Sequence, residues 1–362
     1  MTRRVLFTIV LAAICALAAR STAAQQPSNT PWRFLVSGDS RNCGDVVMPA
    51  IADTARKNQV AFYWHLGDLR AIYNFDEDIQ HQPEHIKRPL TISDYEDIAW
   101  PDFIDSQIAS FGSIPFMLGI GNHETVAPEK TRQEYLAQFA DWLDTPVLQA
   151  QRLRDNPNDH RLKTYFHWVD RGVAFYNLDN ATPEQFDPPQ LLWLEHVLAA
   201  DMANQNIKSI VVGMHEALPE SIAAVHSMND YPVGTETGNR VYADLLRAQN
   251  EAHKHVYVLA SHSHYFMEGI FNSQYWKQHG GVLPGWIVGT AGAVRYALPE
   301  PHTDAKAAMT NVYGSLLATV SPDGEIRFEF QKLEETNIPA PVMAKYGKDF
   351  VHWCFVENTQ AK

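Results

Sequence analysis

Apolar runs of strand length recur along the chain, and most of them end in polar residues. The clearest of these runs are residues 32–37, 60–66, 114–120, 164–169, 173–178, 209–214, 255–260 and 286–290. Strands that are apolar at nearly every position are typical of sheets covered on both faces. The pattern therefore predicts sheets that are buried between other layers of the molecule.

Helical patterns lie between several of these strands. They cover residues 45–58, 129–143, 189–203 and 239–253. Alternation of strands and helices predicts an α/β architecture. In the C-terminal third, residues 315–320 and 325–333 flank the sequence Ser-Pro-Asp-Gly, which favours a hairpin with a tight turn. Because a hairpin is antiparallel, the sheets are expected to be mixed.

The N-terminal segment, residues 1–24, has the layout of a secretory signal peptide. Arg3 and Arg4 precede an apolar run from Val5 to Ala19, and small residues follow it. This run is shorter than the roughly 20 residues of a membrane-spanning helix. We therefore expect an exported protein, periplasmic or secreted, with an uncleaved N-terminal anchor as the alternative. A second long apolar run is absent from the sequence, so we expect no membrane span in the mature chain.

The composition of the 362 residues is that of a globular protein, with 45% hydrophobic and 20% charged residues. It excludes a disordered chain, a collagen-like fibre and a small disulfide-rich protein. The formal charge of −13 falls to −16 if the three arginines of residues 1–24 are removed. An acidic chain argues against nucleic acids and anionic lipids as partners, although bound metal cations can reverse the sign locally.

Two cysteines lie beyond the N-terminal segment, Cys43 and Cys354. In an exported protein they could form a disulfide, or they could stay separate and buried, and the sequence leaves both possibilities open. Residues 336–362 show no clear pattern and are treated as a C-terminal extension. The stretches 69–113 and 215–254 lack clear strands, so they are candidates for insertions around a site.

Short polar motifs follow five of the predicted strands. They are Gly-Asp-Ser-Arg at 38–41, Gly-Asp-Leu-Arg at 67–70, Gly-Asn-His-Glu at 121–124, His-Glu at 215–216 and Ser-His-Ser-His at 261–264. In open α/β sheets, ligands bind at the carboxyl ends of strands. A single Gly-Asp after a strand is usually a helix cap, and a single histidine is usually structural. The joint occurrence of these motifs, always after an apolar strand, is what predicts a functional site.

This set of motifs resembles that of the calcineurin-like metallophosphoesterases, the broad family that includes purple acid phosphatases and serine/threonine protein phosphatases. The resemblance runs from about residue 33 to residue 330, and Gly-Asn-His-Glu and His-Ser-His are its most specific parts. It implies a four-layer α/β/β/α sandwich with two mixed β-sheets, in a domain over residues 32–335. It also implies a centre of two metal ions, iron, manganese or zinc, at the strand ends.

The resemblance assigns a role to each polar residue. Six would be metal ligands: Asp39 and His264 on the first ion, Asp68 bridging both ions, and Asn122, His215 and His262 on the second ion. His123 would contact the phosphoryl group or protonate the leaving oxygen. Carboxylate, amide and imidazole groups suit these metals, and two ions about 4 Å apart can activate a water and clamp a phosphate.

Two positions depart from the family pattern. Arg41 stands where many members carry a histidine ligand of the first metal, and Ala71 stands where purple acid phosphatases carry a tyrosine. The first metal is therefore expected to be under-coordinated, weakly bound, or completed by water or another residue. Arg41 and Arg70 could bind substrate phosphate, or they could form salt bridges with acids. His226 lies in a segment that could form a substrate wall or a plain surface loop.

Together the motifs predict an exported metal-dependent phosphoesterase, in which metal-bound hydroxide hydrolyses small-molecule phosphate esters, monoesters above all. Two alternatives stay open. One is a phosphodiesterase of the same fold, and the other is a protein that binds metal or phosphate without catalysis. The sequence predicts neither the physiological substrate nor the oligomeric state.

Overall fold

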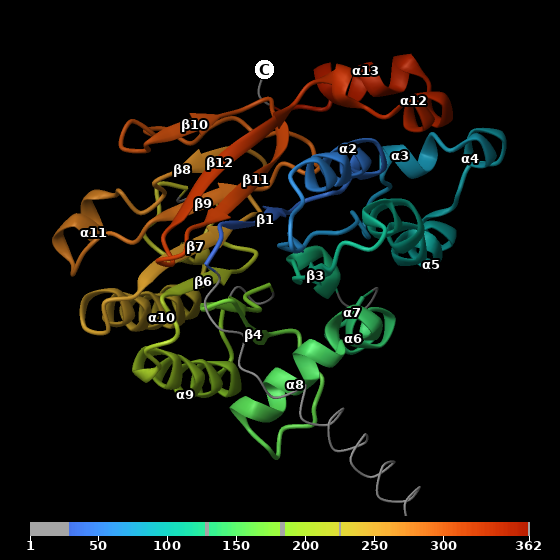
Figure 1. The fold of residues 1–362 in the computed structure, drawn as a ribbon. Coiled ribbons are helices and arrows are strands. Elements are labelled where there is room, and N and C mark those ends of the chain that lie inside the picture. Colours follow the sequence, from blue (N-terminus) through green and yellow to red (C-terminus); the bar gives the residue numbers. More distant parts are fainter. Residues whose placement is uncertain (1–28, 127–129, 182–184, 224–225, 361–362) are drawn as a thin grey trace, which may run out of the picture.

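The computed structural model describes residues 29–126, 130–181, 185–223 and 226–360. Its strands are β1 (Trp32–Ser37), β2 (Tyr63–His65), β3 (Phe116–Leu118), β4 (Phe166–Asp170), β5 (Val173–Asn177), β6 (Ser209–Gly213), β7 (His255–Ala260), β8 (Phe266–Glu268), β9 (Gly285–Val288), β10 (Ala307–Met309), β11 (Tyr313–Val320) and β12 (Ile326–Leu333). They form two mixed sheets, of order β12-β11-β1-β2-β3 and β10-β8-β9-β7-β6-β5-β4 (Figure 1). The strands β1, β2 and β3 run parallel to one another, and so do β5, β6, β7 and β9.

Helices cover the outer faces of both sheets. The α-helices are α2 (Gly44–Lys57), α3 (Glu77–Gln80), α4 (Pro83–Lys87), α5 (Ile92–Asp102), α6 (Arg132–Gln138), α7 (Ala140–Leu143), α8 (Pro146–Asp155), α9 (Pro188–Ala203), α10 (Pro232–Asn250), α11 (Gln274–Gln278), α12 (Ala340–Tyr346) and α13 (Lys348–Val356). Helix α2 packs on β11 and β12, and α10 packs on β7 beside α9 (Figure 1).

Alternating side chains along the strands fix the order of the layers. On β1, Phe34 and Val36 belong to an apolar cluster between the sheets, which they share with Val211 of β6. The neighbouring Leu35 belongs to a second cluster that includes α2. On β6, Ile210 belongs to a third cluster that includes α9 and α10. Since successive strand residues face opposite sides, the layers run α/β/β/α, which confirms the predicted fold class.

The predicted strands and helices are present, with some changes at their ends. Within residues 130–143 the predicted helix is two helices, α6 and α7, because the backbone leaves helical geometry at Phe139. Helix α10 begins at Pro232, before its predicted start, and proline is favoured at a first helical position. The pattern does not predict β8 and β10, because each lies in a short apolar stretch, whereas the equally short β2 and β3 lie within the longer apolar runs 60–66 and 114–120.

The C-terminal extension packs on the helical layer beside the five-stranded sheet. Cys43 and Cys354 form a disulfide, with Cα atoms 6.0 Å apart. Helix α12 contacts α2, and the Tyr346 hydroxyl donates to Asp45 Oδ2 at 2.8 Å. Phe350 of α13 is buried in the same cluster as α2. The extension is therefore part of the folded core rather than a free tail.

The segment for which the sequence predicts a signal peptide, residues 1–24, lies outside the described residues. In the part of the chain that the structure describes, no helix is both long enough and apolar enough to span a membrane.

A buried ion-pair network joins β4 to the helices α8 and α9. The Nδ1 atom of His167 on β4 lies 3.0 Å from Asp155 Oδ2, and its Nε2 atom lies 3.0 Å from Asp201 Oδ2. Burial alone would lower the pKa of His167, but the two carboxylates outweigh it and raise the pKa to about 9. His167 is therefore protonated at neutral pH and links two helices to the edge of the sheet.

We expect this network to weaken as the pH rises. Because the pKa of His167 is about 9 when folded and near 6.5 when unfolded, its contribution is complete below pH 6.5 and is lost as the pH rises through 9. The contribution is about 3 kcal/mol. Urea denaturation at pH 6.5 and at pH 9.5 measures it, and a His167→Gln variant should lack this part of the pH dependence. His352→Gln, which removes an exposed His–Glu pair, serves as the control. Equal pH dependence in wild type and His167→Gln would contradict the assignment.

Candidate metal centre

Loops at the carboxyl ends of five strands meet at one edge of the sandwich. They carry all six predicted metal ligands: Asp39 after β1, Asp68 after β2, Asn122 after β3, His215 after β6, and His262 and His264 after β7. The first three come from the five-stranded sheet and the last three from the seven-stranded sheet. The packing of the two sheets against each other is therefore what assembles the group.

The backbone at three of these residues has a positive φ angle, which is uncommon outside glycine. The angle is 61° at Asp39, 59° at Asp68 and 63° at His262. Residues hold such conformations where the surrounding structure imposes them, and they gather at functional sites. Gly121 has a different constraint, because a Cβ atom there would collide with Asp68 Oδ1. Close approach of the loops thus explains the glycine of the Gly-Asn-His-Glu motif.

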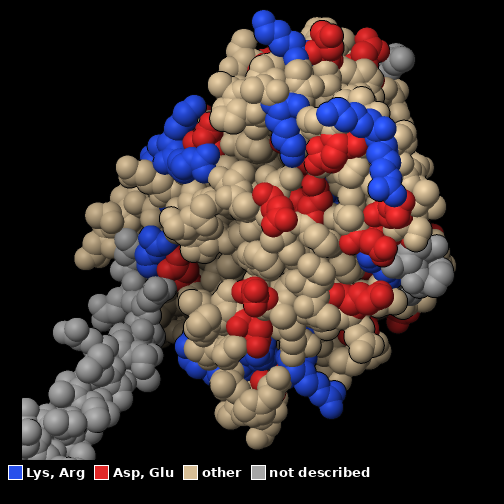
Figure 2. Space-filling model, turned by 90° about the vertical axis from the view of Figure 1, so that its right-hand side faces the viewer, with Lys and Arg blue, Asp and Glu red and all other residues tan. Residues whose placement is uncertain are grey.

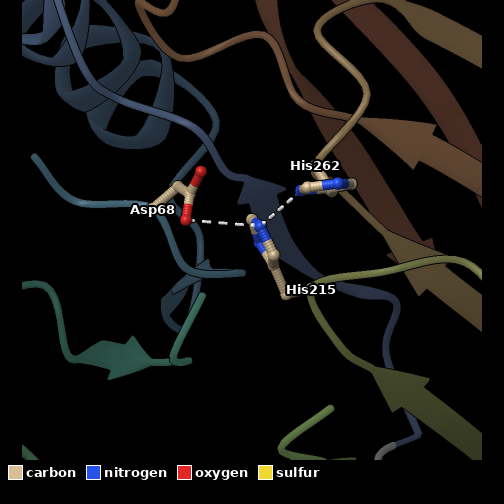
Figure 3. A group of neighbouring side chains, drawn as sticks. All are labelled: Asp68, His215 and His262. Carbon is tan, nitrogen blue, oxygen red and sulfur yellow. Dashed lines mark hydrogen bonds and ion pairs between the residues drawn. The ribbon is translucent and has the colours of Figure 1, made fainter. Parts of the chain in front are cut away.

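Four of the predicted ligands converge on one point. His215 Nε2 lies 2.9 Å from Asn122 Oδ1, 3.0 Å from His262 Nδ1 and 3.3 Å from Asp68 Oδ1. Figure 3 shows Asp68, His215 and His262 approaching one another from separate loops. His215 Nδ1 donates to the carbonyl oxygen of Leu66 at 3.0 Å, so Nε2 presents a lone pair. A cluster of lone-pair donors around one point fits a metal ion.

The first ligand group, which consists of Asp39, Asp68 and His264, contains an additional side chain, that of Arg41. His264 Nδ1 donates to the carbonyl oxygen of Val294 at 2.7 Å, which leaves the Nε2 lone pair 3.2 Å from Asp39 Oδ1. Arg41 Nη2 donates to that same Nε2 atom at 2.9 Å, and Arg41 Nε lies 3.5 Å from Asp68 Oδ2. The guanidinium therefore lies among the ligands that the family pattern assigns to the first metal.

His123 lies beside both groups. Its Nδ1 atom donates to the carbonyl oxygen of Ala71 at 2.6 Å, and its Nε2 atom accepts a hydrogen bond from Arg41 Nη1. The ring of Tyr73 stacks on it at 4.7 Å, with the Tyr73 hydroxyl 3.3 Å from Nε2. Burial lowers the pKa of His123 to about 3, although the charge of Asp68 acts in the opposite direction. His123 is thus a neutral imidazole whose Nε2 atom faces Arg41.

The two aspartates of the centre differ in acidity. Burial raises the pKa of Asp39 to about 7, and the charge of Asp68 adds to this effect. Burial also favours the neutral form of Asp68, but the neighbouring His123, His215 and Arg41 outweigh it and hold its pKa below the usual range. Asp68 is therefore the firmly ionised carboxylate of the centre. A carboxylate that belongs to both ligand groups has to be ionised to bind a metal ion.

Sequence reasoning assigned no role to two residues that shape this site. Glu124 is buried and accepts hydrogen bonds from the backbone N–H groups of Asp68, Leu69 and Gly121 at 2.8 to 2.9 Å. It thereby ties the loop after β2 to the loop after β3. Its place as the last residue of Gly-Asn-His-Glu is the signal that could have revealed it. Tyr296, whose ring lies 4.0 Å from that of His264, has no such motif around it.

The two remaining residues that were predicted to bind substrate, His226 and Arg70, lie in different places in the structure. The His226 ring lies 5.3 Å from the His262 ring and stacks on Tyr296 at 5.4 Å, so it lines the edge of the centre. Arg70 does not reach the centre. Its guanidinium is fully buried and pairs with aspartates of the surrounding helices, so the salt-bridge alternative is the one that the structure supports for this residue.

Residues 33–266 match the family model of the calcineurin-like phosphoesterases, and the chain belongs to that family. This confirms the predicted resemblance and with it the class, a metal-dependent hydrolase of phosphoric esters whose family uses a dinuclear metal centre. A search of curated proteins finds no match to the sequence.

Among solved structures, the chain is similar to purple acid phosphatase PPD1 from yellow lupin (Lupinus luteus) seeds, with a TM-score of 0.57 and 16% identity. The match covers 84% of this chain and 52% of that one, so this chain spans about half the length of the lupin protein. PhoD is also similar, with a TM-score of 0.51 and 14% identity over 92% of this chain and 78% of that one. At such identities the likeness concerns the fold alone.

Proposed function

We propose that this protein is an exported phosphoesterase that hydrolyses phosphate monoesters of small molecules. The observation that carries the proposal is the convergence of Asp68, Asn122, His215 and His262 on one point. A metal ion bound there would supply positive charge to the phosphoryl oxygens and activate a water as the nucleophile. Iron, manganese and zinc each accept such a donor set. The family's centre is dinuclear, but the proposed activity requires only this second ligand group.

Arg41 and His123 support a monoester as the substrate. A monoester phosphate carries about two negative charges at neutral pH, against one for a diester. The buried guanidinium of Arg41 offers N–H groups to such oxygens. A bound dianion beside His123 would favour protonation at its Nε2 atom, since Nδ1 is already held on the Ala71 carbonyl. His123 could then deliver that proton to the leaving oxygen.

The surface charges support a small molecule rather than a polyanion as the substrate. On the face drawn in Figure 2, acidic and basic side chains are interspersed. Nucleic-acid binding relies on a continuous basic surface, because each phosphate contact needs its own cation. The formal charge of −13 also argues against a polyanion as the substrate.

A substrate comparison tests this function. The metal-free protein is loaded in turn with zinc, manganese or iron, and hydrolysis of p-nitrophenyl phosphate is compared with that of bis(p-nitrophenyl) phosphate. We expect at least one metal to support turnover, with kcat/KM at least about tenfold higher for the monoester. A faster diester reaction would overturn the monoester assignment. Full metal occupancy without turnover of either ester would favour the non-catalytic alternative.

Export is proposed on two observations. Residues 1–24 have the layout of a signal peptide, and the Cys43–Cys354 disulfide is of a kind that persists in oxidising compartments. Fractionation of cells that express the full chain should place the protein outside the cytoplasm, and deletion of residues 2–24 should retain it inside. Equal distribution of the two forms would contradict export.

A further inference from the structure

We propose that the guanidinium of Arg41 takes the place of the first metal ion, so that the centre binds a single metal ion. The ion would be held by Asp68, Asn122, His215 and His262. Arg41 would donate a hydrogen bond to His264 and supply the positive charge beside Asp39 and Asp68. This inference rests on the proposed function and deepens it, because it concerns the number of metal ions at the same site.

The two ligand groups differ in what their lone pairs face. In the second group, the Nε2 lone pair of His215 lies 2.9 Å from Asn122 Oδ1 and accepts a hydrogen bond from His262 Nδ1 at 3.0 Å, but an imidazole can move that proton to its other ring nitrogen when a metal ion binds. In the first group, the Nε2 lone pair of His264 already accepts an N–H from Arg41 Nη2 at 2.9 Å. A metal ion needs that same lone pair. An arginine cannot give up its N–H proton, so the first group keeps a fixed donor of this chain where a metal ion would bind, and the second group does not.

The charges of the centre also fit a single ion. Asp39 Oδ1 and Asp68 Oδ2 are buried, and neither has a hydrogen-bond partner among the described residues. Both carboxylates interact electrostatically with Arg41. Two carboxylates facing one guanidinium leave a net negative charge, which one divalent ion overcompensates. A second divalent ion would add its charge directly beside the guanidinium, at a Coulombic cost that a neutral histidine at this position would not impose.

The chain around Arg41 is held in place, so the guanidinium cannot easily leave. The backbone N–H of Asn42 donates to Asp76 Oδ1 at 2.6 Å, and the Asn42 side chain donates to Glu77 Oε2 at 2.7 Å. The next residue, Cys43, is covalently joined to Cys354. Since the two residues directly after Arg41 are anchored, displacement of Arg41 by an incoming metal would have to come from side-chain rotation in a buried site.

Metal stoichiometry tests the inference without relying on activity. Metal-free protein is saturated with manganese, freed of excess ion, and analysed by elemental analysis and by electron paramagnetic resonance. For wild type we expect about one ion per chain and the spectrum of an isolated Mn²⁺; for Arg41→His, which restores the family ligand, about two ions and a spin-coupled pair. Arg41→Met removes the charge without adding a ligand. It should bind a second ion more weakly than Arg41→His does, and it covers the case in which Arg41→His fails to fold.

The outcomes separate this inference from the proposed function. Two tightly bound, spin-coupled ions in wild type would overturn the role of Arg41 and leave the phosphoesterase proposal standing. A single ion in wild type and in both variants would also overturn it, because removing the guanidinium would then have opened no site. Absence of bound metal from wild type would overturn the proposed function itself.

Discussion

An Asp68→Asn variant is expected to lose about 10³-fold in kcat/KM toward p-nitrophenyl phosphate, because the metal centre loses its firmly ionised carboxylate. Asp68 lies in both ligand groups, with Oδ1 3.3 Å from His215 Nε2 and Oδ2 3.5 Å from Arg41 Nε. Asparagine is the informative replacement. It keeps the shape of the side chain, can still accept the backbone N–H of His123 at Oδ1, and tolerates the positive φ of 59°. The loss should therefore reflect missing charge rather than a damaged loop.

The matched control is Asp53→Asn on α2, where a partly exposed aspartate pairs with Arg56. It should keep the wild-type rate. Metal content is measured in parallel, and the Asp68→Asn protein is expected to hold less metal at equal metal concentration. A variant that binds metal and hydrolyses the monoester at the wild-type rate would rule out Asp68 as a ligand.

Much of this site could be predicted because its chemistry lies in short motifs at the ends of apolar strands. Asp39, Asp68, Asn122, His215 and the pair of histidines after β7 are each adjacent to a strand in the sequence. Among parallel strands of one sheet, adjacency to a carboxyl end determines position, so the hydrophobic pattern places these residues at the edge of each sheet. The packing of the two sheets then brings the two sets of residues together. The same pattern predicts sheets that are covered on both faces, whereas the order of the four layers is implied by the resemblance to the calcineurin-like phosphoesterases.

What could not be predicted depends on the direction of long side chains. Arg41 and Arg70 occupy equivalent positions, each the last residue of a Gly-Asp-x-Arg motif. The structure directs the guanidinium of Arg41 into the metal centre and that of Arg70 away from it. Motif spacing fixes where a backbone lies, but an arginine can reach partners several ångströms away in many directions. The partners of Arg70 come from helices α2, α3 and α5, and the packing of these helices depends on the whole fold.

Arg70 organises a buried cluster of charges that joins the helices of the five-stranded side. Its Nη2 atom lies 2.6 Å from Asp45 Oδ1 on α2, and its Nη1 atom lies 3.1 Å from Asp78 Oδ1 on α3. It also pairs with Asp102 at the end of α5. Burial, with the nearby charge of Asp45, raises the pKa of Asp78 well above its usual value. A single guanidinium therefore pairs with several carboxyl groups inside the protein. Tyr346 of the C-terminal extension donates a hydrogen bond to one of them, Asp45.

Replacing Arg70 with leucine should therefore destabilise the protein by about 3–5 kcal/mol or prevent folding, because buried carboxylates would lose their cation. Arg56→Leu is the control, since this exposed arginine pairs with Asp53 and its loss should cost about 1 kcal/mol at most. Urea denaturation at pH 7.5 and pH 5 measures both variants. Without Arg70, the pKa values of the carboxylates in the folded state rise further, so the Arg70→Leu defect should shrink as the pH falls and they take up protons.

The same variant distinguishes a structural from a substrate-binding role for Arg70. At pH values where Arg70→Leu remains folded, its KM for p-nitrophenyl phosphate should equal that of wild type, since Arg70 is buried among aspartates and does not reach the metal centre. If stability were unchanged while KM rose severalfold, the guanidinium would have to turn toward the substrate in solution. The buried cluster would then not explain why an arginine occupies the last position of this Gly-Asp-x-Arg motif. The physical expectation is the opposite, because several buried carboxylates cannot release their shared cation without taking up protons or water.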